Sequence, residues 1–167
     1  MLVVGIDPGT ATTGFGLITE TASGSLQAVH FGVILTPADL PMAERLLLIH
    51  QNLKDILLLH HPDSGAVEKL FFQKNVKTAL AVGQARGVIL MTLAEFGIPV
   101  AEYSPLDVKN AVVGYGGAEK RQVQQMVKAI LDLPEVPRPD DTADALAIAI
   151  CHLSTARYQA SVDQASS

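Results

Sequence analysis

Acidic residues stand where two short apolar segments of this sequence end. Asp7 follows the run Leu2–Ile6, and Glu68 follows Ala66–Val67. A carboxylate at the end of a buried strand is costly unless it caps a turn, pairs with a cation or binds a metal ion. For Asp7 alone, a turn residue that accepts backbone N–H bonds is an equally good interpretation. The role of Asp7 therefore depends on which other acids lie near it.

The last predicted helix opens with three further acids, Asp140, Asp141 and Asp144. Capping and the helix macrodipole stabilise acids in a first turn by a few tenths to about 1 kcal/mol each. They explain Asp144 less well, because it lies a full turn inside the helix. Asp141 and Asp144 are three residues apart and Asp140 and Asp144 are four apart, so either pair shares a helix face. The spacing leaves the choice between Asp140 and Asp141 open.

We expect Asp7, Glu68 and the acids of the last helix to meet at one edge of a sheet. A ligand set made only of carboxylate oxygens suits Mg²⁺ or Mn²⁺ better than Zn²⁺. Two such ions can activate a water molecule and stabilise the leaving oxygen when a phosphodiester is cleaved. The acids therefore predict hydrolysis of a nucleic-acid backbone.

Hydrophobic periodicity predicts an α/β fold that can bring these acids together. Three consecutive strands with short connections indicate an antiparallel meander: Leu2–Ile6, Thr12–Ile18 and Ser25–Leu35. Two further strands, 66–68 and 98–103, alternate with helices, which indicates parallel pairing. The helix 42–60, with Asp39 as its N-cap, precedes the first of these strands, and the helix 75–96 connects the two. Helices over 104–113, 118–131 and 141–158 follow. The prediction is a five-stranded mixed sheet, three antiparallel strands and then two parallel ones, flanked by helices.

Size and composition are those of one globular domain. The chain has 167 residues, of which 49% are hydrophobic and 17% charged, and this is enough for a single core. We predict one domain over residues 1–158 and a disordered tail over 159–167, which is small and polar. No apolar run reaches the roughly 18 residues of a membrane span and no targeting segment is recognisable, so we expect a cytoplasmic protein without a membrane partner.

The net charge of -5 is unfavourable for binding nucleic acid, but the basic residues are concentrated in the middle of the chain. Phosphate contacts depend on this distribution more than on the total charge. An ordinary solvated surface is the alternative interpretation of these cations. They are Lys69, Lys74, Lys77, Arg86, Lys109, Lys120, Arg121 and Lys128.

Several short motifs, in order along the chain, resemble the bacterial RuvC family. They are Gly5-Ile6-Asp7-Pro8-Gly9, Val67-Glu68, Phe71 with Lys74-Asn75, Gly83-Gln84-Ala85-Arg86-Gly87, Val108-Lys109, Ala118-Glu119-Lys120 and the stretch from Asp141 to Ala147. The resemblance runs from residue 1 to about residue 157. It implies a ribonuclease H-like fold and symmetric, Mg²⁺-dependent nicking of four-way Holliday junctions in recombination and repair. The implied partners are a second copy of the chain, in a homodimer, and the RuvA and RuvB branch-migration proteins.

The resemblance also implies roles for individual residues. Asp7, Glu68, Asp141 and Asp144 match the four metal-binding acids, which hold two Mg²⁺ ions that Mn²⁺ can replace. Lys109 and Lys120 match basic residues near the scissile phosphate. Phe71 matches an aromatic that stacks on a base at the open junction centre, with Phe72 as its neighbouring alternative. For the remaining DNA contacts the basic middle of the chain supplies Lys69, Lys74, Lys77, Arg86 and Arg121.

Two other functions are compatible with parts of the sequence. An actin-like or sugar-kinase-like ATPase also has an apolar strand followed by a segment such as Asp7-Pro8-Gly9-Thr10, but it needs a second lobe for which this chain is too short. A junction-binding module without catalysis, or a resolvase-like protein with another nucleic-acid substrate, would not need the complete set of acids.

Overall fold

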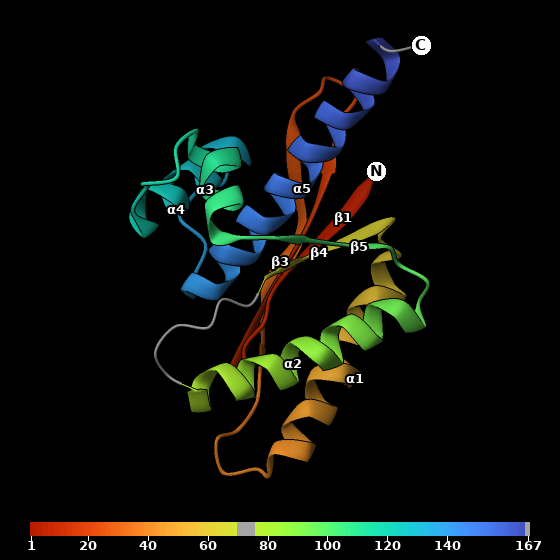
Figure 1. Cartoon of the computed structure of the whole chain (residues 1–167), viewed down its shortest axis with the longest axis vertical. Coiled ribbons are helices and arrows are strands. Elements are labelled where there is room, and N and C mark those ends of the chain that lie inside the picture. Colours follow the sequence, from red (N-terminus) through yellow and green to blue (C-terminus); the bar gives the residue numbers. More distant parts are fainter. Residues whose placement is uncertain (70–75, 166–167) are drawn as a thin grey trace.

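The computed structural model describes residues 1–69 and 76–165. Five strands form one mixed sheet with the order β3-β2-β1-β4-β5 (Figure 1). The strands are β1 (Leu2–Asp7), β2 (Thr12–Glu20), β3 (Leu26–Leu35), β4 (Ser64–Glu68) and β5 (Val100–Tyr103). β1, β2 and β3 pair antiparallel, whereas β1 with β4 and β4 with β5 pair parallel. The predicted topology is confirmed.

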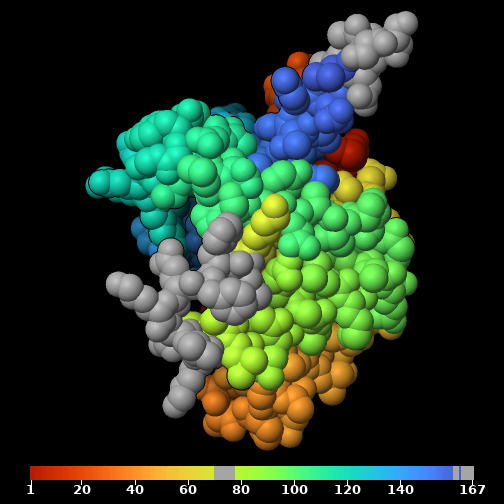
Figure 2. Space-filling model, viewed as in Figure 1, coloured from red at the N-terminus to blue at the C-terminus, as the bar shows by residue number. Residues whose placement is uncertain are grey.

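Helices cover both faces of this sheet, as Figure 1 shows. They are α1 (Met42–His60), α2 (Val76–Glu95), α3 (Pro105–Val113), α4 (Lys120–Ile130) and α5 (Asp140–Ala165). In the space-filling view, α3 and α4 form a lobe beside α2, and α1 lies beyond α2 (Figure 2). No helix in the described parts of the chain combines the length and the hydropathy that a membrane crossing requires.

Alternation along the strands divides the core into two layers. Val3, Ile18 and Ala66 pack with buried residues of α3, α4 and α5. Val4 and Val67, their neighbours in the strands, pack on the opposite face with α1 and α2. The face that a strand residue occupies therefore tells which helices its side chain meets.

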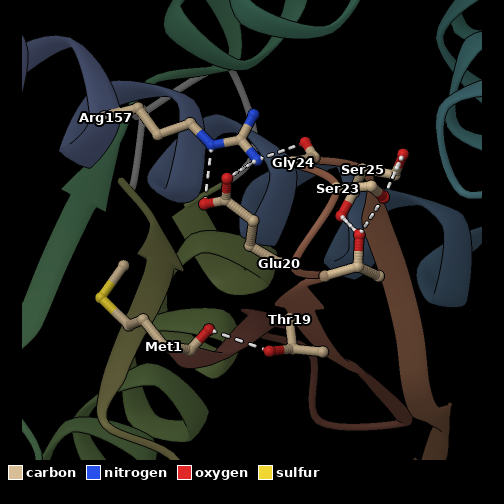
Figure 3. A network of polar contacts seen from close by, with 8 residues as sticks. Met1, Thr19, Glu20, Ser23, Gly24, Ser25 and Arg157 are labelled. Carbon is tan, nitrogen blue, oxygen red and sulfur yellow. Dashed lines mark hydrogen bonds and ion pairs between the residues drawn. The ribbon is translucent and has the colours of Figure 1, made fainter.

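The last helix is longer than predicted. α5 continues to Ala165, so the expectation of a disordered tail is wrong for residues 159–165. The segment from 159 onward contains neither glycine nor proline to interrupt a helix. Arg157 also anchors this end of α5: its Nε lies 3.0 Å from Oε2 of Glu20, and its Nη2 donates to the Gly24 carbonyl at 2.8 Å (Figure 3).

The predicted cap of α1 is also wrong. Pro41 occupies the N-cap position and makes no side-chain cap hydrogen bond. Asp39 lies two residues earlier, in a turn in which the Leu40 N–H donates to the Pro37 carbonyl at 3.4 Å. Asp39 is a favourable residue type for an N-cap, but Pro41 lies nearer to the helix and its ring fixes the backbone φ angle. The helix therefore begins after Pro41.

Candidate active site

Glycines in β1 and β2 allow α5 to lie with its backbone against the sheet. A Cβ atom added to Gly5 would lie 2.3 Å from the Ala145 carbonyl oxygen, and one added to Gly14 would lie 2.0 Å from that of Asp141. Both distances are far below van der Waals contact, so neither position has room for a side chain. The first turns of α5 are therefore held directly over the end of β1.

Two of the predicted acids end neighbouring parallel strands. Asp7 is the last residue of β1 and Glu68 the last residue of β4, and the register pairs Ile6 with Val67. Asp7 lies on the same face as Gly5, and Glu68 on the same face as Ala66, because side chains alternate along a strand. This is the face covered by α5, which brings Asp141 and Asp144 to the same place.

The carboxylates influence one another electrostatically. The pKa of Asp7 is raised from 3.8 to about 8, mainly by burial and then by the charges of Glu68, Asp144 and Asp141, against the opposing effect of Lys120. Burial followed by the charge of Asp144 also raises the pKa of Glu68. The four acids are therefore close enough to affect one another's ionisation.

Lys120, at the start of α4, forms ion pairs with two acids of α5. Its Nζ lies 2.9 Å from Oδ2 of Asp144 and 3.4 Å from Oδ2 of Asp140. Burial lowers the pKa of Lys120, but the contacts with Asp144 and Asp140 outweigh burial and raise it overall. Lys120 thus links Asp144 to Asp140, one of the two acids that the spacing could not rank.

Asp140 has a different environment from the other acids. A hydrogen bond from Gln124, then Lys120 and Arg138, lower its pKa, whereas burial raises that of Asp144. Asp140 is not among the charges that raise the pKa of Asp7, whereas Asp141 is. The electrostatics therefore favour Asp141 as the partner of Asp7.

A pocket of about 190 Å³ opens beside the acids. Its polar wall combines Glu68 and Asp144 with Lys109 and Lys120, and its other wall is apolar. Lys109 comes from α3 and Lys120 from α4, so both helices of the lobe contribute a cation. The pocket offers a phosphate group positive charge next to carboxylates.

The acids fit a hard divalent cation by their chemistry, since all are oxygen donors and their mutual repulsion would be relieved by a positive ion. Within residues 1–69 and 76–165, no three His, Cys, Asp or Glu side chains are grouped closely enough to surround a metal ion. The residues that would hold it are Asp7, Glu68, Asp141 and Asp144, whose side chains would have to draw closer together around the ion.

The other predicted DNA-binding residues are distributed unevenly. Lys69 and Arg121 are exposed, on the chain after β4 and on α4. Phe71 and Lys74, with Phe72, lie outside the described residues, as does the side chain of Lys77. Arg86 differs from all of them. Its side chain is only 17% exposed and forms an ion pair with Glu102, and its Nε donates to the Glu68 carbonyl at 3.2 Å.

Comparison with known proteins decides the family. The model of the family described as crossover junction endodeoxyribonuclease RuvC matches residues 3–152. The chain belongs to the RuvC family. The RuvC protein of Syntrophomonas wolfei is 59% identical over 157 residues, which are 94% of this chain and 91% of the relative.

Solved structures of RuvC agree with this assignment. The Thermus thermophilus RuvC structure is 40% identical, with a TM-score of 0.88 over 95% of this chain and 97% of that one. The same bacterium's RuvC in complex with a Holliday junction substrate is 37% identical, with a TM-score of 0.86 over 95% and 96% of the two chains. The ribonuclease H-like fold implied by the motifs is confirmed.

Sequence reasoning missed the residues that hold the acids of this RuvC chain in place. Gly5 and Gly14 interrupt β-branched strands, and a glycine inside a strand often marks a close backbone approach; that signal was available. The pairing of Arg86 with Glu102 depends on how α2 lies against β5, and no sequence signal indicates it.

Proposed function

We propose that this chain is a structure-specific endonuclease that resolves four-way DNA junctions by metal-dependent hydrolysis of phosphodiester bonds. The observation that carries the proposal is the convergence of Asp7, Glu68, Asp141 and Asp144 in a chain of the RuvC family. One of the similar solved structures is a RuvC in complex with a Holliday junction substrate. The alternative of an actin-like or sugar-kinase-like ATPase is not supported, because the described residues form a single sheet and this sheet belongs to the nuclease fold.

The four acids would hold two Mg²⁺ ions, which Mn²⁺ could replace. When bound, such ions activate a water molecule for attack on phosphorus and stabilise the leaving oxygen. These carboxylates would bind and orient the ions. Because the pKa of Asp7 is raised to about 8, binding of a cation would favour the loss of its proton. The fit rests on the oxygen-only donor set and on the repulsion among these acids.

Lys109 and Lys120 would hold the scissile phosphate. Both line the pocket that Glu68 and Asp144 share. Ammonium groups fixed beside a phosphate stabilise the negative charge that grows on its oxygens as water attacks. Lys120 is already held by Asp144 and Asp140, so it needs little reordering when DNA enters.

Further contacts would extend from this centre along the DNA. Lys69 and Arg121 are exposed and would be two of these contacts. Lys74, Lys77 and Phe71 are the remaining proposed contacts, with Phe71 stacking on a base. Residues 1–158 would act as one nuclease domain in a cytoplasmic homodimer, so that two centres cut symmetrically. RuvA and RuvB would be its branch-migration partners.

The test uses a labelled four-way junction, a duplex of the same arms and a single strand, each incubated with the protein and Mg²⁺, Mn²⁺ or a chelator. We expect paired nicks in the junction alone, and none with the chelator. Nicking of all three DNAs would make the chain a non-specific nuclease. Binding of the junction without cleavage under any metal would make it a binding module.

A further inference from the structure

Arg86 reaches the end of β4 from the face of the sheet opposite the acids. Val67 packs with α1 and α2, and Arg86 lies in α2 between residues that face the same layer. Glu68 points to the other face, toward α5. Arg86 therefore contacts the main chain of Glu68 and not its carboxylate.

The contact lies where the pairing of β4 with β1 ends, while its pairing with β5 continues. The pairing of β1 with β4 ends at Ile6 and Val67, so β1 offers Glu68 no further partner. On the β5 side, the Lys69 N–H donates to the Tyr103 carbonyl at 2.8 Å. The Nε of Arg86 supplies the Glu68 carbonyl with a donor at this point, 3.2 Å away. A fixed donor on this carbonyl restrains the backbone of Glu68, and with it the point from which the side chain projects toward the other acids.

Glu102 holds Arg86 in the orientation that this contact requires. The register of the parallel pair sets Val67 beside Glu102, which places the carboxylate of Glu102 on the α2 face. Nη2 of Arg86 forms an ion pair with this carboxylate. The planar guanidinium can serve a carboxylate and a carbonyl at once, which a lysine ammonium on a flexible stem does much less well.

We propose that Arg86 is a positioning residue that, with Glu102, orients Glu68 for metal binding, and that it is not a contact for DNA. This inference rests on the proposed function, since it assigns Glu68 to the metal site. It assigns Arg86 a role that differs from the one expected of the basic middle of the chain.

Three variants separate positioning from DNA contact. Arg86→Lys retains the positive charge but loses the planar guanidinium, and Arg86→Gln loses both. Glu102→Gln removes the negative charge that forms the ion pair with Arg86. Lys54→Gln is the control, because Lys54 is an exposed cation of α1 whose ion pair is with Glu95. The measurements are Mn²⁺ affinity of the DNA-free protein by calorimetry, junction affinity in chelator, the single-turnover cleavage rate in Mg²⁺, and the free energy of unfolding.

Positioning predicts that Arg86→Lys and Arg86→Gln weaken Mn²⁺ binding and slow cleavage by about 10-fold or more. Glu102→Gln is expected to act in the same direction, and all three variants should bind the junction within about twofold of wild type. Lys54→Gln should change none of these. The unfolding measurements identify any variant that fails to fold. If the Arg86 variants do not fold, the Mn²⁺ affinity and cleavage rate of Glu102→Gln, which leaves Arg86 intact, test the inference.

DNA contact predicts the opposite pattern. Arg86→Gln would then weaken junction binding, Arg86→Lys would largely preserve it, and Glu102→Gln would strengthen it by freeing the cation. That pattern, or unchanged Mn²⁺ affinity in folded Arg86 variants, would overturn the inference. If wild type binds Mn²⁺ but never cuts a junction, the proposed function fails while the Mn²⁺ comparison still tests Arg86.

Discussion

Burial of Asp7 disfavours the charged carboxylate that its proposed role as a metal ligand requires. The metal-free protein keeps this carboxyl in a buried, acidic place that raises its pKa to about 8. Each pKa unit corresponds to about 1.4 kcal/mol between protonation states. The site is therefore expected to store unfavourable energy that a bound cation, or the loss of the charge, releases.

This conflict gives a pH dependence of stability. Because the pKa of Asp7 is higher in the folded protein than its ordinary 3.8, stability from this group is complete below about pH 4 and is lost as the pH rises through about 8. We expect Asp7→Asn to be more stable than metal-free wild type by a few kcal/mol at pH 8 and by much less near pH 4. Urea denaturation in chelator at several pH values measures this difference. Parallel profiles for the two proteins would show that Asp7 is not buried as a charge.

Asp140 and Asp141 provide a matched pair of substitutions. Asp141 contributes to the high pKa of Asp7, whereas Asp140 pairs with Lys120 and accepts from Gln124. Asp141→Asn is expected to reduce junction cleavage by at least about 100-fold, because it removes a proposed metal ligand. Asp140→Asn should retain cleavage within about 10-fold. Single-turnover rates in Mg²⁺ measure both, and an inactive Asp140→Asn with an active Asp141→Asn would reverse the assignment.

At the scale of elements, the site depends on how closely α5 approaches the sheet. Gly14→Ala would force a Cβ to within 2.0 Å of the Asp141 carbonyl oxygen, so the helix must move. We expect a loss of about 3 kcal/mol in the free energy of unfolding and a large loss of cleavage, since Asp141 and Asp144 move with α5.

Gly87→Ala is the control for this substitution. Gly87 lies in α2, and no atom of the described residues lies within 4 Å of an added Cβ. Alanine there should stabilise the protein by about 0.5 to 1 kcal/mol, because it favours the helix. Equal effects of the two substitutions on the free energy of unfolding would contradict the close approach at Gly14.

At the scale of the whole molecule, the sequence predicted what local patterns determine. The strand order follows from short connections among the first three strands and from helices between the later ones, and α1 spans the predicted 42–60. Tertiary contacts determine what it missed. Asp140 is distinguished from Asp141 by its contacts with Lys120 and Gln124 of α4 and with Arg138. Arg86 is distinguished from an exposed cation by Glu102 of β5 and the Glu68 carbonyl.

The distribution of charge over the molecule gives the last prediction. Despite the net charge of -5, Lys109 and Lys120 line the pocket beside the acids, and Lys69 and Arg121 are exposed on the chain after β4 and on α4. About four phosphate contacts would give a slope near -3.6 for the logarithm of the binding constant against the logarithm of salt concentration. Junction affinity in chelator is measured by fluorescence anisotropy over a range of salt concentrations.

Single substitutions test whether these cations are the source of the slope. Arg121→Gln should make it shallower by about 0.9, the contribution of one phosphate contact. Lys54→Gln removes an exposed cation of α1, on the opposite face of the sheet, and should leave the slope unchanged. A flat salt response of wild type, or an equal change in both variants, would mean that binding does not depend on the cations beside the acids. Because the acids repel phosphate, a steep slope would also show that the attraction of these cations for phosphate exceeds that repulsion.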